Sequence, residues 1–161
     1  MTSDFFTYNK AKVIQALRYH FITRREIKLM IILVNVFAVA SACLYFFLPG
    51  RISPQAFFIS SFLWAILMLS FWFIMPQMVY RKAQTFKDSF KASFNDTGFS
   101  IENERGSREW NWQELSCWLE SPHFFHLYFN PRSFFIIPKK AFVGDDVHAA
   151  RKILAQHVKK Q

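Results

Sequence analysis

Two long runs without a charged residue constrain this sequence most strongly. The first covers residues 29–48 and the second covers residues 56–79. About 20 apolar residues in a helix, each rising 1.5 Å, cross the roughly 30 Å hydrocarbon layer of a membrane. A soluble domain of 161 residues rarely buries two helices on every face. We therefore predict that both runs are membrane-spanning helices.

A short connection between the two runs predicts that they form a hairpin. It is seven residues long, from 49 to 55, and it contains Pro49, Gly50 and Pro54. Turn-forming residues in so short a link bring the second helix back antiparallel to the first. The sequence thus predicts a transmembrane helical hairpin over residues 29–79.

Small residues at matched depths indicate where the two helices touch. Ala38 and Ala42 are four residues apart in the first run, and Ser61 and Ala65 are four apart in the second. Small side chains let two helix backbones approach closely. We predict that these four residues pack within the hairpin, with contact to a second copy of the chain as the alternative.

The polar content of the two runs is low. Neither run contains Asp, Glu, Lys, Arg or His, and such groups mark ion and substrate paths within membranes. Their absence argues against a self-sufficient pump or transporter. Asn35 is expected near the level of Ser70, where it would bond that serine or a second copy.

Basic residues flank the hairpin mainly on one side and predict its orientation. The loop between the runs contains only Arg51. The residues beside the other ends are Lys10, Lys12, Arg18, Arg24, Arg25 and Lys28 before the first run, and Arg81, Lys82, Lys87 and Lys91 after the second. Basic loops stay in the cytoplasm, so we predict that both termini are cytoplasmic. The formal charge of +9 is then explained by topology and by anionic lipid, without nucleic-acid binding.

Residues 1–28 are predicted to form a basic juxtamembrane helix. Val13, Leu17 and Phe21 fall at helical spacing among its basic residues. Such a helix either lies among the lipid headgroups or packs on the cytoplasmic domain, and the pattern favours neither. The predicted contacts with lipid headgroups are Arg24, Arg25, Lys28, Arg132, Lys139 and Lys140.

Residues 80–161 change from continuous apolar runs to short alternating ones. Turn-forming residues interrupt them at 95–98, 104–106 and 130–133, and Trp110 and Trp112 alternate as on a strand. An amphipathic helix is predicted over 145–159. We therefore expect an α+β membrane protein: a two-helix hairpin, and a small antiparallel β meander of the pleckstrin-homology-like kind closed by a C-terminal helix.

Four segments of this cytoplasmic region resemble the YcxB-like family. They are FNDTGF at 94–99, WQEL at 112–115, FHLY at 125–128 and IIPKKAF at 136–142. The resemblance implies a small bacterial inner-membrane protein with two spans and a cytoplasmic domain related to pleckstrin-homology-like folds. It implies no catalytic residue, because the family is described as of unknown function.

The residues themselves also predict no catalytic, cofactor or metal site. The four glycines stand singly, so a phosphate-binding loop is not expected. Cys43 and Cys117 are far apart and are expected to be structural thiols. His123 and His126 are expected on opposite faces of a strand. Glu120, with the other nearby glutamates, is expected on a solvated face.

The function expected from these features is non-enzymatic. The hairpin would anchor the chain in lipid, and the cytoplasmic domain would bind a membrane or cytoplasmic protein. The alternative is a small accessory subunit of a transport or secretion assembly, which would bind its partner through the spans.

Overall fold

A computed structural model describes residues 1–131 and 133–161 of the protein. The chain forms two compact units. Residues 1–16 and 84–161 form one, which we call the β unit, and residues 17–83 form the other, which we call the helical unit. Six strands in two antiparallel sheets, together with the long helices, confirm the predicted α+β class.

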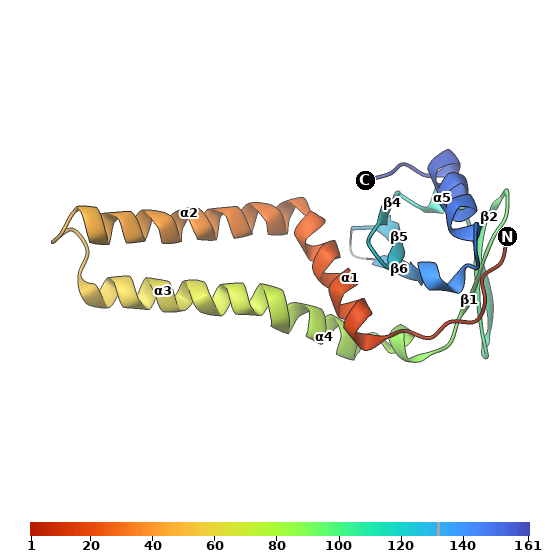
Figure 1. Ribbon diagram of the computed structural model, residues 1–161, viewed down its shortest axis with the longest axis horizontal. Coiled ribbons are helices and arrows are strands. Elements are labelled where there is room, and N and C mark those ends of the chain that lie inside the picture. Colours follow the sequence, from red (N-terminus) through yellow and green to blue (C-terminus); the bar gives the residue numbers. More distant parts are fainter. Residues whose placement is uncertain (132) are drawn as a thin grey trace. The chain divides into compact units, whose positions relative to one another are not determined.

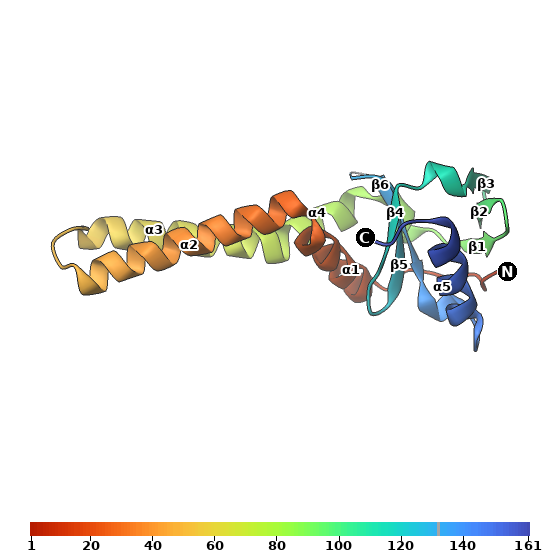
Figure 2. The same cartoon turned by 90° about the horizontal axis from the view of Figure 1, so that it is seen from above.

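The helical unit is dominated by a hairpin. Helix α2 (Arg25–Phe47) is followed by α3 (Pro54–Leu69), a π-helical turn (Ser70–Ile74) and α4 (Met75–Lys82). Figures 1 and 2 show α2 and α3 running antiparallel beside each other. The side chain of Ser53 accepts a hydrogen bond from the amide of Ala56 at 3.3 Å and caps α3, as expected for a serine before a proline at the start of a helix.

The observed helices extend beyond the two predicted runs, 29–48 and 56–79, at three of their four ends, whereas α2 ends at Phe47, one residue before the end of its run. Helix α2 begins at Arg25 and α4 continues to Lys82. The difference has a simple cause, because a charged residue ends an apolar run without ending the helix. The apolar runs therefore indicate which part of each helix lacks charged residues, whereas capping and packing determine where each helix ends.

A π-helical turn and a proline interrupt the second long helix. In a regular α-helix the amide of residue 76 would donate to the carbonyl of Trp72, but Pro76 has no amide hydrogen. The amide of Met75 instead donates to the carbonyl of Ser70, five residues earlier. The Nε atom of Arg18, from the end of α1 that belongs to the helical unit, donates to the Trp72 carbonyl at 2.9 Å.

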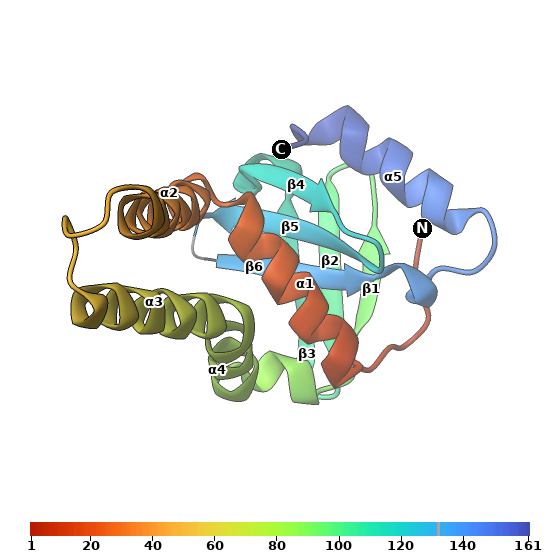
Figure 3. The ribbon, with the colours of Figure 1, turned by 60° about the vertical axis from the view of Figure 1, so that its left-hand side comes forward.

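The β unit contains two sheets of three strands, each a simple antiparallel meander. The first sheet comprises β1 (Lys91–Phe94), β2 (Gly98–Asn103) and β3 (Gly106–Asn111). The second comprises β4 (Cys117–Glu120), β5 (Phe124–Asn130) and β6 (Ser133–Pro138). Figure 3 shows the strands of the two sheets crossing one another, which is the arrangement of an orthogonal sandwich. Within the described residues, the predicted single meander of about five strands is thus two meanders with six strands.

The turn between β1 and β2 and the close pairing of β2 with β3 explain the glycine of the FNDTGF segment. The amide of Gly98 donates to the Oδ1 atom of Asn95 at 2.6 Å. A Cβ atom at position 98 would lie 1.9 Å from the carbonyl oxygen of Trp110. Glycine is required here because the backbones of β2 and β3 approach too closely for a side chain.

Aromatic side chains form the core between the sheets. Phe94, Phe99, Trp118 and Phe125 are all almost completely buried. Trp112 is also buried, but the prediction that it continues a strand is wrong, because β3 ends at Asn111 and residues 112–114 form a 3-10 turn. The reason is local, since Asn111 and Glu114 form a capping box that starts the turn.

Helix α5 (Asp146–His157) closes the β unit. Ala150 and Leu154 are fully buried in the core. The helix is shorter than the predicted 145–159, because the chain after Val158 runs beside β4, where the amide of Trp118 donates to the carbonyl of Lys159 at 3.0 Å. This contact replaces the last helical turn.

The first nine residues belong to the β unit and are not helical. The amides of Ser3 and Phe6 donate to the carbonyls of Ala92 and Phe90, both at 2.7 Å. Helix α1 covers only Lys10–Thr23, so the predicted helix over residues 1–28 is corrected to a shorter one after an extended segment. The extended part is explained by Phe6, which is buried in the core of the β unit.

Candidate functional site

The predicted packing residues of the hairpin all lie at half-buried positions. This holds for Ala38 and Ala42 in α2 and for Ser61 and Ala65 in α3. Most large apolar side chains on the same helices are exposed. The small residues therefore have the burial expected of the α2–α3 contact, and their packing role stays a prediction.

Polar bonds between the two long helices lie at other residues. The hydroxyl oxygens of Ser41 and Ser60 are 3.1 Å apart. The indole nitrogen of Trp64 donates to the Oδ1 atom of Asn35 at 3.3 Å. The side-chain nitrogen of Asn35 lies 3.9 Å from the sulfur of Met68. Within the hairpin Asn35 thus contacts Trp64 and Met68 and not the predicted Ser70, and its contact with a second copy stays a prediction.

The rest of the hairpin surface is apolar and uncovered. Phe47 is 80% exposed and Ile59 is 70% exposed. By length and composition, Arg25–Phe47 and the second long helix, Pro54–Lys82, are long and apolar enough to cross a membrane, and only 6% and 0% of their most apolar windows are buried. Contact with lipid or with another protein would remove this apolar surface of the helical unit from water.

Basic residues stand at the start of α2, as predicted. Arg25 and Lys28 are exposed. The Nε atom of Arg24 lies 3.8 Å from a carboxylate oxygen of Glu26, which is a weak exposed pair. These positions leave Arg25 and Lys28 available to a lipid surface, whereas Arg132 lies outside the described residues.

Lys139 is engaged in an ion cluster of the β unit. Its ammonium lies 2.6 Å from a carboxylate oxygen of Glu120, and the guanidinium of Arg151 lies 2.7 Å from the same oxygen. Hydrogen bonds from Arg151 and the charge of Lys139 lower the pKa of Glu120 to about 2. The predicted solvated position of Glu120 is therefore wrong, since its side chain is only 16% exposed.

This cluster changes the interpretation of Lys139. Its ammonium also lies over the ring of Phe125, 5.5 Å from the ring centroid. The strand order explains the cluster, because Glu120 ends β4 while Lys139 follows β6, and β5 pairs with both strands. The position of Lys139 favours a structural role, and only its neighbour Lys140 is exposed.

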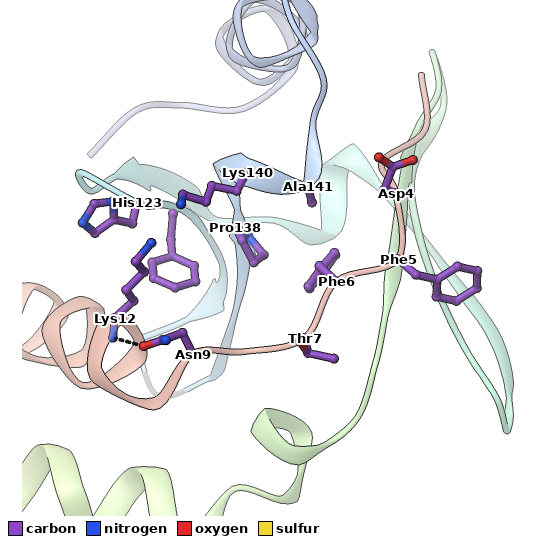
Figure 4. A pocket seen from close by; sticks show the side chains of 11 residues that line it. Asp4, Phe5, Phe6, Thr7, Asn9, Lys12, His123, Pro138, Lys140 and Ala141 are labelled. Carbon is purple, nitrogen blue, oxygen red and sulfur yellow. Dashed lines mark hydrogen bonds between the residues drawn. The ribbon is translucent and has the colours of Figure 1, made fainter.

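A pocket of about 340 Å³ lies in the β unit beside Lys140. Figure 4 shows Lys12, His123 and Lys140 gathered at one end, with Asp4 and Phe5 at the other. Sequence reasoning missed this site, because its residues come from the extended segment before α1, from the first turn of α1, from the start of β5 and the link before it, and from the end of β6 and the turn after it. The signal available in the sequence was the pair of adjacent lysines in the IPKKAF segment.

The two histidines near β5 have different surroundings. His126 is completely buried, and its Nε2 atom lies 2.9 Å from the hydroxyl of Ser121. His123 is half-buried and lines the pocket. Among the residues that the structure describes, no group of three His, Cys, Asp or Glu side chains is arranged to hold a metal ion.

Comparison with known proteins identifies a family for part of the chain. Residues 94–154 match the sequence model of a family described as YcxB-like protein. The matched segment runs from the last residue of β1 into α5, so the match confirms the resemblance carried by the four sequence segments. No curated protein and no solved structure is significantly similar to the chain.

Proposed function

We propose that this YcxB-like protein is a non-enzymatic integral membrane protein of the bacterial inner membrane. The hairpin of α2 and α3–α4 anchors it in the lipid, and the β unit is a pleckstrin-homology-like interaction module at the cytoplasmic surface. The observation that carries the proposal is the apolar surface of the hairpin. Phe37, Phe47, Phe58 and Ile59 are each at least 65% exposed, and such a continuous apolar surface marks contact with a membrane or another protein.

The length of the helices supports lipid as the environment of the exposed apolar surface. The 23 residues of α2 extend roughly 34 Å at 1.5 Å per residue, enough for a hydrocarbon layer of about 30 Å. A core helix of a soluble protein of similar hydropathy would be mostly buried, whereas only 6% and 0% of the most apolar windows of these two helices are buried. Burying them in lipid removes the apolar surface from water.

The distribution of basic residues supports the orientation. Arg24 precedes the hairpin, Arg25 and Lys28 lie in the first turn of α2, and Arg81 and Lys82 end α4. The loop between α2 and α3 contains Arg51 as its one basic residue. The ends of an antiparallel hairpin lie on the same side of a membrane, and basic residues favour the cytoplasmic side. Both chain segments that build the β unit are therefore on one side, in the cytoplasm.

Extraction of native membranes tests the anchoring. The full chain is expressed at a low level, and the membranes are washed with carbonate at high pH and then with neutral detergent. We expect the protein to stay in the pellet after carbonate and to be released only by detergent. Release by carbonate would show that the hairpin does not span the lipid and would overturn the membrane assignment.

The second candidate function is an accessory subunit of a transport or secretion assembly. The same exposed apolar side chains favour it, because a larger membrane protein can cover them as well as lipid can. Replacing residues 25–82 with an unrelated helical hairpin of equal length separates the two. If the partners cross-linked in native membranes are the same for both chains, the β unit does the binding. Loss of those partners despite correct insertion would favour the accessory subunit.

A further inference from the structure

We propose that the pocket beside Lys12 and Lys140 binds a small ligand that carries a phosphate or carboxylate group next to an apolar part. The pocket is formed entirely by the β unit. The proposal therefore goes beyond the membrane anchoring and does not depend on it.

Two ammonium groups without a carboxylate partner form the charged end of the pocket. The Lys12 side chain lies within hydrogen-bonding reach of that of Lys140, and this close contact, followed by the like charge of Lys140, lowers the pKa of Lys12. Within residues 1–131 and 133–161, neither lysine forms an ion pair with an acidic side chain. Two like charges in contact raise the free energy of the empty site, and an anion between them would lower it.

Lys139 differs from Lys140 in having an acidic partner, so the lack of such a partner is not a general property of this basic segment. Lys139 is adjacent in sequence, yet its ammonium contacts Glu120 at 2.6 Å. Asp4 is the acidic residue that lines the pocket, and it lies at the opposite end from the two lysines (Figure 4). Lys12 and Lys140 can therefore bind an anionic group that comes from outside the chain.

The remaining groups of the charged end suit an oxyanion. Figure 4 shows His123 beside Lys140 and Asn9 beside Lys12. The Oδ1 atom of Asn9 accepts a hydrogen bond from the amide of Lys12 at 3.3 Å, which fixes the first turn of α1 at the pocket. Ammonium groups and an imidazole are donors that bind phosphate and carboxylate oxygens through charge-assisted hydrogen bonds.

The apolar wall of the pocket favours a ligand that has an apolar part beside its anionic group. Phe6, Phe124 and Pro138 line it, and the two phenylalanines are buried in the protein with 7% and 2% exposure. A volume of about 340 Å³ is at the small end of the range for ligand sites, which are mostly apolar with a few polar groups for orientation. The ligand class is accordingly a small amphiphilic anion, either a free solute or the headgroup of an anionic lipid.

Calorimetric titration of the full chain in neutral dodecyl maltoside micelles tests the proposal. The probes are phenyl phosphate, which has both an anionic and an apolar part, and benzyl alcohol, which lacks the charge. We expect saturable binding of phenyl phosphate and none of benzyl alcohol. Lys12→Gln and Lys140→Gln should each weaken binding at least tenfold. The matched control Lys152→Gln changes an exposed lysine on α5 outside the pocket and should alter the affinity less than twofold.

Further variants separate loss of charge from loss of folding. Lys12→Arg keeps the positive charge and should retain binding within a few fold, and Lys12→Gln should not lower the midpoint of thermal unfolding, because it removes a like-charge contact. Absence of saturable phenyl phosphate binding, or equal affinity in the wild type and both glutamine variants, would overturn the proposal. Dihexanoyl phosphatidate then distinguishes the sources: tighter binding than phenyl phosphate indicates a lipid headgroup, and weaker binding indicates a free solute.

Discussion

The Nε atom of Arg18 donates a hydrogen bond to the main-chain carbonyl of Trp72 at 2.9 Å, and its guanidinium lies over the Trp72 ring, 5.5 Å from the centroid. This is the carbonyl that would receive an amide hydrogen from residue 76 in a regular α-helix, where the chain has Pro76. Arg18 therefore supplies the donor that proline removes. The bond ties the end of α1 to the second long helix within the helical unit.

Loss of this donor is expected to destabilise the helical unit. We predict that Arg18→Leu lowers the free energy of unfolding in neutral micelles by about 1–2 kcal/mol, because a carbonyl with few other donors loses a charged partner. Arg25→Leu, which changes an exposed arginine in the first turn of α2, serves as the control and should change the free energy of unfolding little. Thermal unfolding followed by circular dichroism measures both.

A double-mutant cycle identifies the cause of that loss. Pro76→Ala restores the amide donor of residue 76, so Arg18→Leu should be less destabilising in the Pro76→Ala background than in the wild-type chain. An equal loss in both backgrounds would show that Arg18 acts through its ring contacts and not through the Trp72 carbonyl.

The ion cluster around Glu120 is expected to stabilise the β unit. Glu120→Gln leaves the charges of Lys139 and Arg151 without their carboxylate, and we predict a loss of about 1–2 kcal/mol in the free energy of unfolding. Glu104→Gln changes an exposed glutamate in the turn between β2 and β3 and should have no measurable effect. Denaturant titration of the three chains makes the comparison.

The pH dependence of the same cluster has a definite sign. The folded-state pKa of Glu120 is about 2, below its usual value of 4.5, so the unfolded chain binds more protons between these values. The stability that Glu120 contributes is present above pH 4.5 and is lost as the pH falls towards 2. Glu120→Gln should lack this contribution. A wild-type and a variant chain with parallel stability curves over that range would contradict the assignment.

His20 is expected to remain neutral in mildly acidic solution. Burial, and secondarily the charge of Arg24, lower its pKa to about 4 from 6.5. Its contribution to stability is therefore complete above pH 6.5 and decreases as the pH falls towards 4. Histidine ring signals in an NMR titration, with His20 assigned by the His20→Gln variant, report the midpoint directly. A midpoint near 6.5 would show that the ring is solvated.

The extended N-terminal segment is expected to contribute to folding of the β unit. The hydroxyl of the buried Ser3 accepts a hydrogen bond from the amide of Ala92 at 2.9 Å. Ser3→Ala leaves that buried amide without its acceptor, and we predict a loss of about 1–2 kcal/mol. Thr2→Ala, at the exposed neighbouring position, is the matched control. Equal unfolding midpoints for the two variants would show that the segment is not part of the cooperative unit.

Long-range patterns were predictable from the sequence. The apolar runs 29–48 and 56–79 match the observed helices except at Leu48, and the change to short alternating runs after residue 80 correctly indicated strands. Both patterns depend on periodicity over many residues, which is the most reliable signal in a single sequence. The segments FNDTGF and IIPKKAF also indicated the family that matches residues 94–154.

Features that depend on tertiary contact were not predictable. The pairing of residues 1–6 with β1, the engagement of Lys139 by Glu120 and the approach of Lys12 to Lys140 each join segments far apart in the chain. The prediction that Trp112 continues a strand was wrong for a local reason. Its alternation with Trp110 is strand-like, but the Asn111–Glu114 capping box starts a 3-10 turn. In each case a specific contact overrides the local pattern.

The most direct test of the membrane account is thiol labelling of the full chain in spheroplasts. Cys43 and Cys117 are replaced by alanine, and single cysteines are introduced as Arg51→Cys in the loop between α2 and α3 and as Glu104→Cys in the turn between β2 and β3. A membrane-impermeant maleimide is added before or after lysis. The account predicts that the cysteine of Arg51→Cys is labelled in intact spheroplasts and that of Glu104→Cys only after lysis. Labelling of the Glu104→Cys chain before lysis, or protection of both positions until lysis, would contradict it.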